Sequence, residues 1–567
     1  MQNNNFREII LENAIKHKGK ADLKFVINSL LAKDASLKEQ IKEISDSIKP
    51  IISEINSLSI DEQKKQMEQI NPNFFEKKEK EERNIFAFLN IKSGDKIVTA
   101  FPPSPEKYYH IGHAKSIYLN YLLAKQYNGK FYLRFEDTNP INVKPEFYKI
   151  MLEDISLLGV EWDELQYASD YLDLFIEYAE KLIKNNQAYI CFCDPDTLKK
   201  NRFQGIPCNC RNHTPEQNLK YWEEMKTSYP PEKASLRLKI DIHHKNTTMR
   251  DPIIFRVIDA SHPRLEKKYR IYPTYDFQNA IMDGYFGITH RFRTKEFELR
   301  SELHHYIRKL LGLYDTYTYE FARFNLIGME SSGRKIREKV QSGELIGWDD
   351  PSLPTLRALK RRGFSPEAIK QLVIESGISK ASGTKLTWDT LYKYNRRVLN
   401  DTAKRFFLIK EPVEITIKND PCRNIQLSLH PKLDLGKRNF SCTGKYLIEK
   451  SDFDNFKNGD LIRLIDNLNF ICENGEYIYK NQEYLEYKNA QASSKAIIHF
   501  LPNDSSQLVD VTILMPDKQL IKGLAEKNIE LLNIGDIIQF ERWAFCRLDS
   551  IDVQNNKKIY NFWFTHL

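Results

Sequence analysis

The sequence of 567 residues has no apolar run of membrane-spanning length, and its polar start, MQNNNFREII, does not resemble a secretory signal. We therefore expect a cytoplasmic protein. Internal repeats and low-complexity tracts are missing too, and a composition that is 41% hydrophobic and 29% charged excludes a disordered chain. The net charge of +8 permits a polyanionic partner without requiring one. A chain of this length should hold several domains.

Glycine-rich nucleotide fingerprints are absent from the first strand–helix unit. The stretch DKIVTAF, residues 95–101, is short, β-branched and aromatic, and two prolines end it, so it predicts a buried strand. A helical pattern and a second strand follow without GxGxxG or GxxxxGK[ST]. Instead, HIGH at residues 110–113 stands at the start of the helix, whose positive end suits phosphate. Taken alone, a His-x-x-His pair is more often structural.

Cysteine is scarce, but four of the eight cysteines gather in CFCDPDTLKKNRFQGIPCNC. They are Cys191, Cys193, Cys208 and Cys210. Two CxC pairs in one short segment are typical of tetrahedral zinc coordination, with His213 as a spare ligand. The alternatives are free thiols in a loop, or a site that has lost its metal. The other four cysteines are scattered and are interpreted as structural.

The pattern along the chain changes several times. Alternating strands and helices predict a parallel α/β sheet, interrupted by the cysteine segment. Short alternating runs near the end predict one or two β-barrels. We expect an N-terminal helical region at 1–92, the two halves of the α/β domain at 93–187 and 269–345, an insertion at 188–268, a helical connecting domain at 346–408 and the β-barrel part at 409–567.

Five motifs occur in one order along the chain. They are HIGH, LRFEDTNP (133–140), YPTYDF (272–277), GITHRFRTKEF (287–297) and GWDDPSLPTLRALKRRGF (347–364). In these motifs the chain resembles class I aminoacyl-tRNA synthetases, and among them the archaeal-type glutamyl-tRNA synthetases and their glutaminyl relatives. The resemblance implies a Rossmann-type catalytic domain, an insertion that binds the acceptor stem and a β-barrel anticodon-binding domain.

The resemblance also implies a reaction. L-glutamate would be joined to ATP, with Mg²⁺, as a glutamyl-adenylate, and then passed to tRNA(Glu) with release of AMP and diphosphate. Charging of tRNA(Gln) is left open. Negative charge builds on phosphorus and on the departing diphosphate, so such a site needs fixed positive charge more than a nucleophile.

The first ATP-binding segment is HIGH itself. His110 and His113 match the catalytic histidines of the family and would donate hydrogen bonds to the ATP phosphates. Gly112 has no side chain, so it would let the adenosine approach the backbone.

The second phosphate loop of the family, KMSKS, is matched imperfectly by ESSGRK, residues 330–335. Gly333 stands where many members have the second lysine, and Lys335 follows just after. We assign Ser332, Arg334 and Lys335 to ATP, with Lys335 as the catalytic cation at the diphosphate and Arg334 as its helper. The glycine and serines suit a mobile loop that closes over ATP. The alternative is that SSGRKIREK is only the polar start of a helix.

Four residues match the amino acid pocket of the family. Glu136 would hold the substrate ammonium group, Tyr275 would lie against the substrate side chain, and Asn279 is a further pocket candidate. Arg293 stands where glutamyl enzymes have arginine and glutaminyl enzymes a small neutral residue. An arginine pairs with a carboxylate through two parallel hydrogen bonds, whereas an amide would leave the cation unpaired. Arg293 therefore favours glutamate.

Two residues depart from the family pattern. Ala100 replaces an arginine that usually precedes the F-[PA]-P motif, and Lys107 stands where glycine is common. Either another cation supplies the lost contact or the pocket differs. The alternatives to a glutamate–tRNA ligase are a glutaminyl-tRNA synthetase, a non-catalytic tRNA-binding paralogue and a truncated paralogue that modifies a tRNA base. Arg293 disfavours the first, the HIGH histidines and the long C-terminal part disfavour the second, and that C-terminal part disfavours the third.

Overall fold

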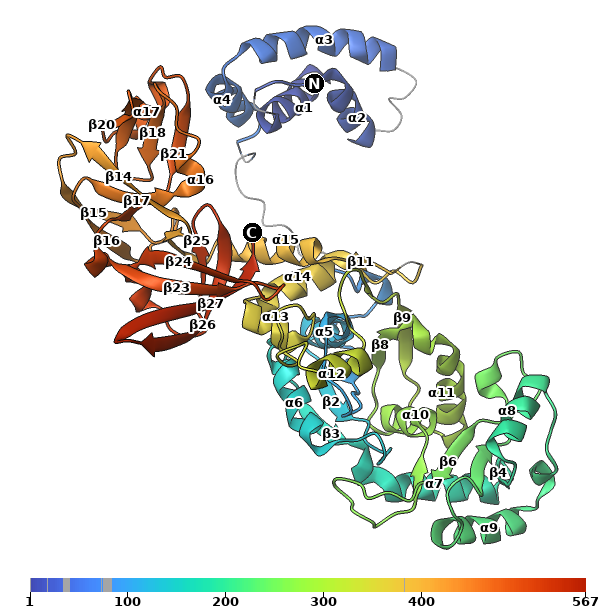
Figure 1. The fold of residues 1–567 in the computed structure, drawn as a ribbon. Coiled ribbons are helices and arrows are strands. Elements are labelled where there is room, and N and C mark those ends of the chain that lie inside the picture. Colours follow the sequence, from blue (N-terminus) through green and yellow to red (C-terminus); the bar gives the residue numbers. More distant parts are fainter. Residues whose placement is uncertain (1, 18, 34–40, 73, 75–83, 382) are drawn as a thin grey trace. The chain divides into compact units, whose positions relative to one another are not determined.

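The computed structural model describes residues 2–17, 19–33, 41–72, 74, 84–381 and 383–567. These residues belong to two compact units, 1–84 and 85–567, and each unit is described by itself (Figure 1). None of the helices in the described part of the chain combines the length and the apolar character that a bilayer crossing requires. The segment limits expected from the sequence stay predictions.

The first unit is helical. Its helices are α1 (Gln2–Lys16), α2 (Leu23–Lys33), α3 (Ile41–Ser57) and α4 (Ile60–Ile70). Aliphatic side chains from the helices, such as Ile10, Ile48 and Met67, form a buried core of their own. Helix α4 begins at a capping box, in which Ser59 and Glu62 satisfy each other's backbone N–H groups.

The second unit is organised around a five-stranded parallel sheet in the order β3-β2-β1-β8-β9. The strands are β1 (Val98–Phe101), β2 (Lys130–Phe135), β3 (Glu164–Tyr167), β8 (His290–Thr294) and β9 (Tyr317–Phe321). The associated helices are α5 (Ile111–Gln126), α6 (Pro145–Ser156), α10 (Tyr275–Tyr285) and α11 (Glu298–Leu311). The predicted parallel α/β sheet is therefore confirmed. The strand order reverses between β1 and β8, and in such sheets ligands bind beyond the carboxyl ends of the strands at this switch point.

The insertion forms a separate antiparallel sheet in the order β4-β5-β6-β7. Its elements, with the helix that precedes them, are α7 (Leu172–Lys184), β4 (Ala188–Cys191), α8 (Pro195–Gln204), α9 (Pro215–Thr227), β5 (Ser235–Leu238), β6 (Ile253–Val257) and β7 (Ile271–Pro273). The fully buried Trp222 of α9 packs against Phe255 of β6, so the sheet and its helices share one core.

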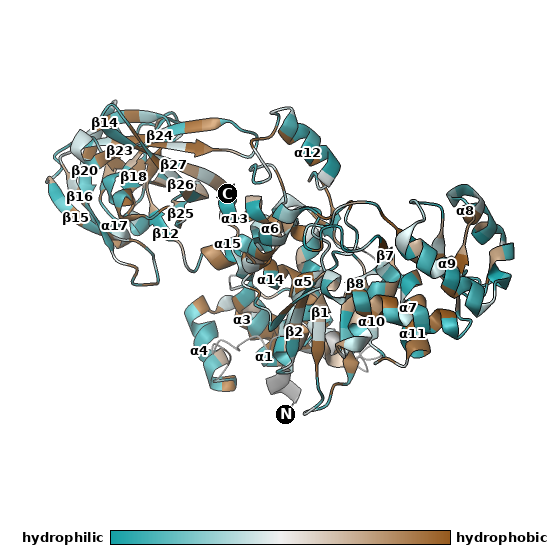
Figure 2. Cartoon of the chain, turned by 90° about the horizontal axis from the view of Figure 1, so that it is seen from below, coloured by the Kyte–Doolittle hydropathy of each residue, from teal (hydrophilic) through white to brown (hydrophobic). Residues whose placement is uncertain are grey.

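Short helices connect this sheet system to the C-terminal part. They are α12 (Gly333–Gln341), α13 (Leu356–Arg362), α14 (Pro366–Ser376) and α15 (Trp388–Leu399), beside the short pair β10 (Asn325–Leu326) and β11 (Lys385–Leu386). Helix α12 is largely hydrophilic (Figure 2), whereas α14 packs against α5. Two backbone hydrogen bonds of 3.0 Å, from Ile111 to Pro354 and from Leu356 to Tyr109, fix the start of α5 to the segment before α13.

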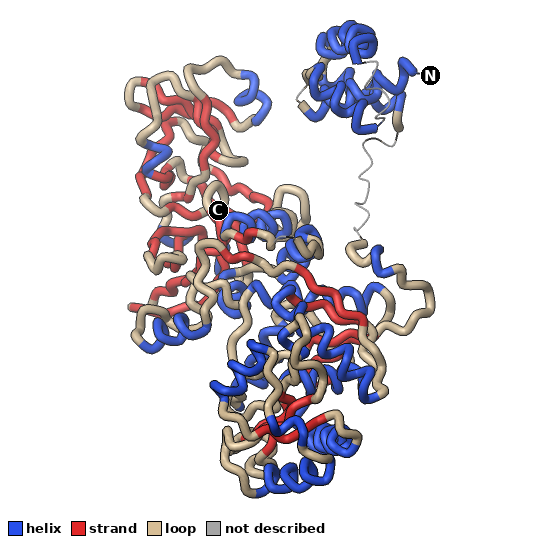
Figure 3. The backbone as a smooth tube through the Cα atoms, turned by 90° about the vertical axis from the view of Figure 1, so that its right-hand side faces the viewer, coloured by secondary structure: helices blue, strands red, loops and turns tan. Residues whose placement is uncertain are grey.

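The C-terminal part is rich in strands, as Figure 3 shows in red. One seven-stranded sheet has the order β12-β25-β26-β27-β23-β24-β13, and a second has the order β21-β18-β19-β20-β14-β17-β22. Strands β15 and β16 form a further, two-stranded antiparallel sheet. The elements are β12 (Lys404–Phe406), β13 (Leu408–Ile409), β14 (Pro412–Lys418), β15 (Arg423–Ser428), β16 (Lys437–Cys442), β17 (Lys445–Glu449), α16 (Lys450–Phe453), β18 (Leu461–Leu464), β19 (Asn469–Glu473), β20 (Glu476–Asn481), α17 (Tyr484–Asn489), β21 (Lys495–Ile498), β22 (Leu501–Pro502), β23 (Leu508–Leu514), β24 (Leu520–Glu526), β25 (Ile537–Phe540), β26 (Ala544–Gln554) and β27 (Lys557–His566).

Candidate active site

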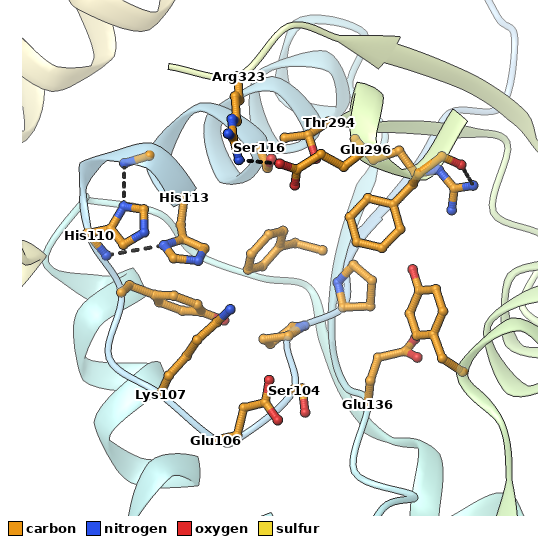
Figure 4. Close-up of a pocket in the computed structure, with 18 of the residues that line it drawn as sticks. Ser104, Glu106, Lys107, His110, His113, Ser116, Glu136, Thr294, Glu296 and Arg323 are labelled. Atoms are coloured by element: carbon orange, nitrogen blue, oxygen red, sulfur yellow. Dashed lines mark hydrogen bonds and ion pairs between the residues drawn. The ribbon is translucent and has the colours of Figure 1, made fainter. Parts of the chain in front are cut away.

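A cavity of about 850 Å³ lies at the carboxyl ends of β1, β2 and β8, beside the sheet's switch point. Its walls come from the loop between β1 and α5, the end of β2, the start of α10, the end of β8 and the segment around residues 323–331. Figure 4 shows His110 and His113 on one side of this cavity and Glu136 on the opposite side. Residues far apart in the sequence therefore surround one space of a size suited to small molecules.

The two HIGH histidines cap helix α5. The Nδ1 atom of His110 accepts a hydrogen bond from the backbone N–H of Gly112 at 3.0 Å. The backbone N–H of His110 in turn donates to Nδ1 of His113 at 3.2 Å. Because both Nδ1 atoms are acceptors, each neutral imidazole has its proton on Nε2. Each ring therefore has one N–H group that the helix cap does not use.

The electrostatics of this pair keep both rings neutral. Burial, aided by the nearby Lys107, lowers the pKa of His110 to about 4, and burial also lowers the pKa of His113. Gly112 has a structural role as well, because a Cβ atom there would lie 2.6 Å from the His110 ring. A glycine between the two histidines is thus required by the cap itself.

Two buried arginines next to the cavity are already paired. Arg134 of β2 donates to Glu136 and to Asp283, in both cases at 2.9 Å. Arg291 of β8 donates to both carboxylate oxygens of Asp283, at 2.6 and 2.9 Å. Although burial opposes the shift, Arg291 and Arg134 lower the pKa of Asp283 to about 2. These two cations are therefore neutralised by the protein.

Arg293, two residues further along β8, differs from both. It lines the cavity and is 7% exposed, yet no acidic side chain of the described chain lies within ion-pair distance of it. Its guanidinium donates to Ser301 Oγ at 2.9 Å and to the Phe297 carbonyl at 3.3 Å and contacts His304 Nδ1 at 3.3 Å, and its Nε has no partner in the described chain. Burial lowers the pKa of this group. Ser301 in turn donates to Glu320, so the nearest carboxylate reaches Arg293 only through a hydroxyl group. The cavity thus contains a desolvated cation without a direct ion pair in the described chain, and this favours an acidic ligand.

Glu136 is held in place from several sides. Its Oε1 accepts hydrogen bonds from Arg134 and from Asn279 Nδ2 at 2.9 Å, and its Oε2 accepts from Gln278. Burial raises the pKa of this carboxyl group, and Arg134 opposes that rise. Each carboxylate oxygen has two acceptor positions, so Oε2 keeps one for a further donor.

The structure places Gln278, not Asn279, in the wall of the cavity. Asn279 is fully buried and acts on the cavity through Glu136. The sequence suggests Asn279 and gives no sign of Gln278. Which face of a short helix meets a ligand depends on how the helix packs, and the sequence of α10 alone does not show this. Tyr275, at the first position of α10, does line the cavity, and burial raises its pKa to about 12.

A second residue that the sequence did not reveal is Lys115 of α5. It is 2% exposed, its Nζ donates to the Ala322 carbonyl at 3.3 Å, and it lies over the rings of Phe321 and Phe324. The sign of it in the sequence is that a lysine stands among the apolar residues of this helix. Lys115 joins the HIGH helix to the chain that leads from β9 towards the second phosphate loop.

That second loop lies largely outside the cavity. Ser331 reaches its wall, whereas Ser332, Arg334 and Lys335 do not. The Lys335 side chain is 66% exposed, with its Nζ 3.7 Å from Glu330, and the Arg334 side chain is 89% exposed and pairs with Glu338 at 2.9 Å. Arg334 borders a neighbouring pocket with Lys107 and Arg337. The predicted phosphate cations are therefore exposed to solvent outside the cavity.

Ala100 and Lys107, the two departures from the family pattern, are placed differently. Lys107 lines the cavity. Ala100 is fully buried and packs with Val98 and Ile288 instead. The register that pairs Thr99 with His290 brings Ala100 level with Arg291 on the next strand.

The four cysteines of the insertion come together as predicted from their spacing. The sulfur atoms of Cys191, Cys193, Cys208 and Cys210 all lie within 4.8 Å of one another. The Sγ atoms of Cys191 and Cys208 are 3.8 Å apart. Ligands at about 2.3 Å in a tetrahedron around zinc are separated by about this distance, so the cluster fits the metal. His213, the spare ligand suggested by the sequence, is not part of this group of ligand atoms.

Comparison with known proteins identifies the class. A family model described as tRNA synthetases class I (E and Q), catalytic domain, matches residues 96–401. Two models described as tRNA synthetases class I (E and Q), anti-codon binding domain, match residues 403–488 and 496–549. The chain therefore belongs to the class I family of glutamyl- and glutaminyl-tRNA synthetases. This confirms the predicted fold class and the prediction of an aminoacyl-tRNA synthetase, a class that uses ATP.

Several archaeal glutamate–tRNA ligases are similar to this chain over nearly its whole length. The glutamate–tRNA ligase of Pyrococcus abyssi is 39% identical over 561 residues, which cover 97% of this chain and 98% of that protein. The glutamate–tRNA ligase of Pyrococcus furiosus is 38% identical, with 97% of each chain covered. That of Methanothermobacter marburgensis is 35% identical, over 95% of this chain and 96% of the relative.

Proposed function

We propose that this chain ligates L-glutamate to tRNA(Glu) in the cytoplasm, through a glutamyl-adenylate and with release of AMP and diphosphate. The observation that carries this proposal is Arg293, a buried cation at the cavity wall without an acidic partner in the described chain. The γ-carboxylate of glutamate would supply the missing anion. Glutamine would leave the cation unpaired, so a glutaminyl-tRNA synthetase is the less favoured function. The names of the similar proteins agree with this choice.

We assign the other end of the amino acid to Glu136 and its neighbours. The free acceptor position of Glu136 Oε2 would receive the substrate ammonium group, while Asn279 and Arg134 keep the carboxylate oriented. Tyr275 would lie against the aliphatic part of the substrate. Two opposite charges at fixed separation would thus select an amino acid with a second carboxylate.

We assign ATP to the histidines' side of the cavity. His110 and His113 would donate from Nε2 to phosphate oxygens. Gly112, which has no side chain, would let the adenosine of ATP approach the backbone. Because both rings are neutral, they would act as hydrogen-bond donors, and most of the positive charge must come from elsewhere. Mg²⁺ accompanies ATP and neutralises charge on its phosphates. Ser332, Arg334 and Lys335 would supply the remaining contacts after the loop closes, since Lys335 would then meet the diphosphate.

We assign the acceptor end of tRNA to the insertion and the anticodon to the C-terminal sheets. The direct test is charging of tRNA(Glu) and tRNA(Gln) transcripts, each also with the other's anticodon.

We propose that Cys191, Cys193, Cys208 and Cys210 hold one structural zinc ion. When bound, zinc would join the segment after β4 to the loop before α9 and so stiffen the insertion. Purified protein should contain about one zinc per chain, and Cys208→Ser should lower that occupancy. Metal-free protein of unchanged stability would contradict this part of the proposal.

The experiment that tests the main proposal is ATP–diphosphate exchange with glutamate and with glutamine, with and without tRNA. Exchange that depends on glutamate supports the proposal, and exchange that depends on glutamine would replace it by the glutaminyl function. Absence of exchange under all conditions would indicate a non-catalytic tRNA-binding paralogue. Exchange with glutamate but without transfer to tRNA(Glu) would indicate a paralogue that modifies another acceptor.

A further inference from the structure

A buried arginine lies against the cysteine cluster and takes no part in the active site. Arg237 of β5 is 2% exposed. Its Nη1 atom lies 3.7 Å from Cys191 Sγ and 3.7 Å from Cys208 Sγ, within the distance of N–H···S hydrogen bonds. A guanidinium group that touches two of the four sulfur atoms must influence their charge.

Among the residues that the structure describes, the rest of the Arg237 side chain has no anionic partner. Its Nε donates to the backbone carbonyl of Asp251 at 2.8 Å, and Nη2 has no hydrogen-bond partner in the described structure. The carboxylate of Asp251 is occupied by Arg211, Tyr189 and the backbone N–H of Ile240. A buried cation without an anion is strongly destabilising, so the sulfur atoms are the available counter-charge.

The sheet fixes this arrangement. Strands β4 and β5 are antiparallel, with Tyr189 opposite Arg237 and Cys191 opposite Ser235. Side chains two residues apart on a strand share a face, so Cys191 and Arg237 project from the same face. The backbone N–H of Phe192 adds a donor to Cys210 Sγ at 3.5 Å. Donors to the sulfur atoms thus come from both the backbone and Arg237.

Four thiolates around a divalent metal give a net charge of −2, which is costly in a partly buried position. We propose that Arg237 is the counter-ion of a four-cysteine zinc centre and that it raises the affinity of the site for zinc by neutralising half of this charge. The proposal rests on the zinc site proposed for this chain. Arg237 is a positioning residue for the metal, and the chemistry at the active-site cavity does not involve it.

The experiment compares two substitutions in the full-length protein. Arg237→Lys keeps the charge, whereas Arg237→Gln keeps a polar but shorter side chain without charge. Zinc affinity is measured by competition with a chromophoric chelator, and cobalt substitution reports the thiolate ligands through their charge-transfer absorption. Arg237→Gln should weaken zinc binding by roughly ten- to a hundred-fold, the usual effect of losing an outer partner of metal ligands. The zinc affinity of Arg237→Lys should be closer to that of the unmodified protein.

Arg250→Gln is the matched control. Arg250 also belongs to the insertion and donates to the backbone carbonyls of His244, Arg202 and Phe203, but in the described part of the chain it has no hydrogen bond to sulfur. Its replacement should leave zinc affinity unchanged. If Arg237→Gln does not fold, Arg237→Met, which also removes the charge, is compared with Arg250→Met, and only the former should weaken zinc binding.

The outcomes separate the two proposals. Unmodified protein that binds no zinc would overturn both the metal site and its counter-ion. Zinc held equally well by Arg237→Gln and the unmodified protein would overturn the counter-ion alone. Equal weakening by Arg237→Gln and Arg237→Lys would also overturn it, because the charge would then make no difference.

Discussion

The two ends of the active-site cavity are built differently. At the end that we propose for the amino acid, Arg293, Glu136 and Gln278 are buried and held by neighbouring side chains. At the phosphate end the histidines are fixed, but Lys335 and Arg334 are exposed and outside the cavity. A small charged side chain is selected best by a desolvated, preformed partner, because its pairing is then strong. A triphosphate must enter and diphosphate must leave, so part of its site has to open.

The largest expected effect concerns the preformed end. Arg293→Cys removes the cation that would pair with the γ-carboxylate, and loss of one partner of a buried charge pair costs about 3–5 kcal/mol. The kcat/KM for glutamate in ATP–diphosphate exchange should fall by at least about two orders of magnitude. The kcat/KM for glutamine should fall much less, because glutamine does not form that charge pair.

Arg323→Cys is the control for this change. Arg323 also lines the cavity, but it is exposed and paired with Glu296 (Figure 4). Loss of this side chain should therefore lower the kcat/KM for glutamate much less than Arg293→Cys does. If glutamate exchange by Arg293→Cys remains undiminished, the assignment is wrong, and Lys107 or Lys295 becomes the next candidate.

The second effect concerns the end that opens. Lys335→Ala should slow adenylate formation by roughly two to three orders of magnitude, because one transition-state donor contributes about 3–4 kcal/mol. Glutamate affinity should change little, and rapid-quench kinetics separate the two quantities. Arg334→Ala, which removes only the helper cation, should slow adenylate formation less than Lys335→Ala. A silent Lys335→Ala beside a damaging Arg334→Ala would show that the phosphate cation lies one residue earlier.

The same contrast explains what the sequence could predict. The parallel sheet, the HIGH helix and the cysteine cluster follow from local pattern and spacing, so residues 98–126 and Cys191–Cys210 were found directly. Gln278 and Lys115 were missed because their importance depends on which helix face meets the cavity. Arg134 and Asp283 are 149 residues apart in the sequence, and a local sequence pattern cannot predict that they pair with each other and with Arg291.

That network answers the question raised by Ala100. Its side chain is buried level with Arg291, and the guanidinium groups of Arg291 and Arg134 converge on Asp283. Ala100→Arg would add a third cation and much volume there, so we expect it to destabilise the protein by about 1–3 kcal/mol. Urea denaturation measures this change, and Ala100→Met separates volume from charge. An Ala100→Arg protein as stable as the unmodified one would mean that the space for the family's arginine is still present.

The smallest expected effect is an absence of titration at the phosphate end. The pKa of His110 is about 4, below the usual 6.5, because of burial and Lys107. A histidine of unshifted pKa would be about three-quarters protonated at pH 6, whereas His110 would be almost wholly neutral. The rate of ATP–diphosphate exchange should therefore show no histidine titration between pH 8 and pH 6. His110→Asn, which keeps an acceptor for the cap but loses the Nε2 donor, should lower this rate without changing its pH profile.

The same shift affects stability, with a definite sign. Because the folded-state pKa is depressed, the unfolded chain binds a proton at His110 below about pH 6.5, and the folded chain does so only near pH 4. The contribution of His110 to stability is therefore present above pH 6.5 and is lost as the pH falls towards 4. Denaturation curves at pH 7.5 and pH 5 should show a smaller loss for His110→Asn than for the unmodified protein. The prediction is wrong if the exchange rate of the unmodified protein falls with an apparent pKa near 6.5 and that of His110→Asn does not. The His110 ring would then be charged when it meets ATP. The phosphate end would depend on histidine charge, as the amino acid end depends on the charge of Arg293.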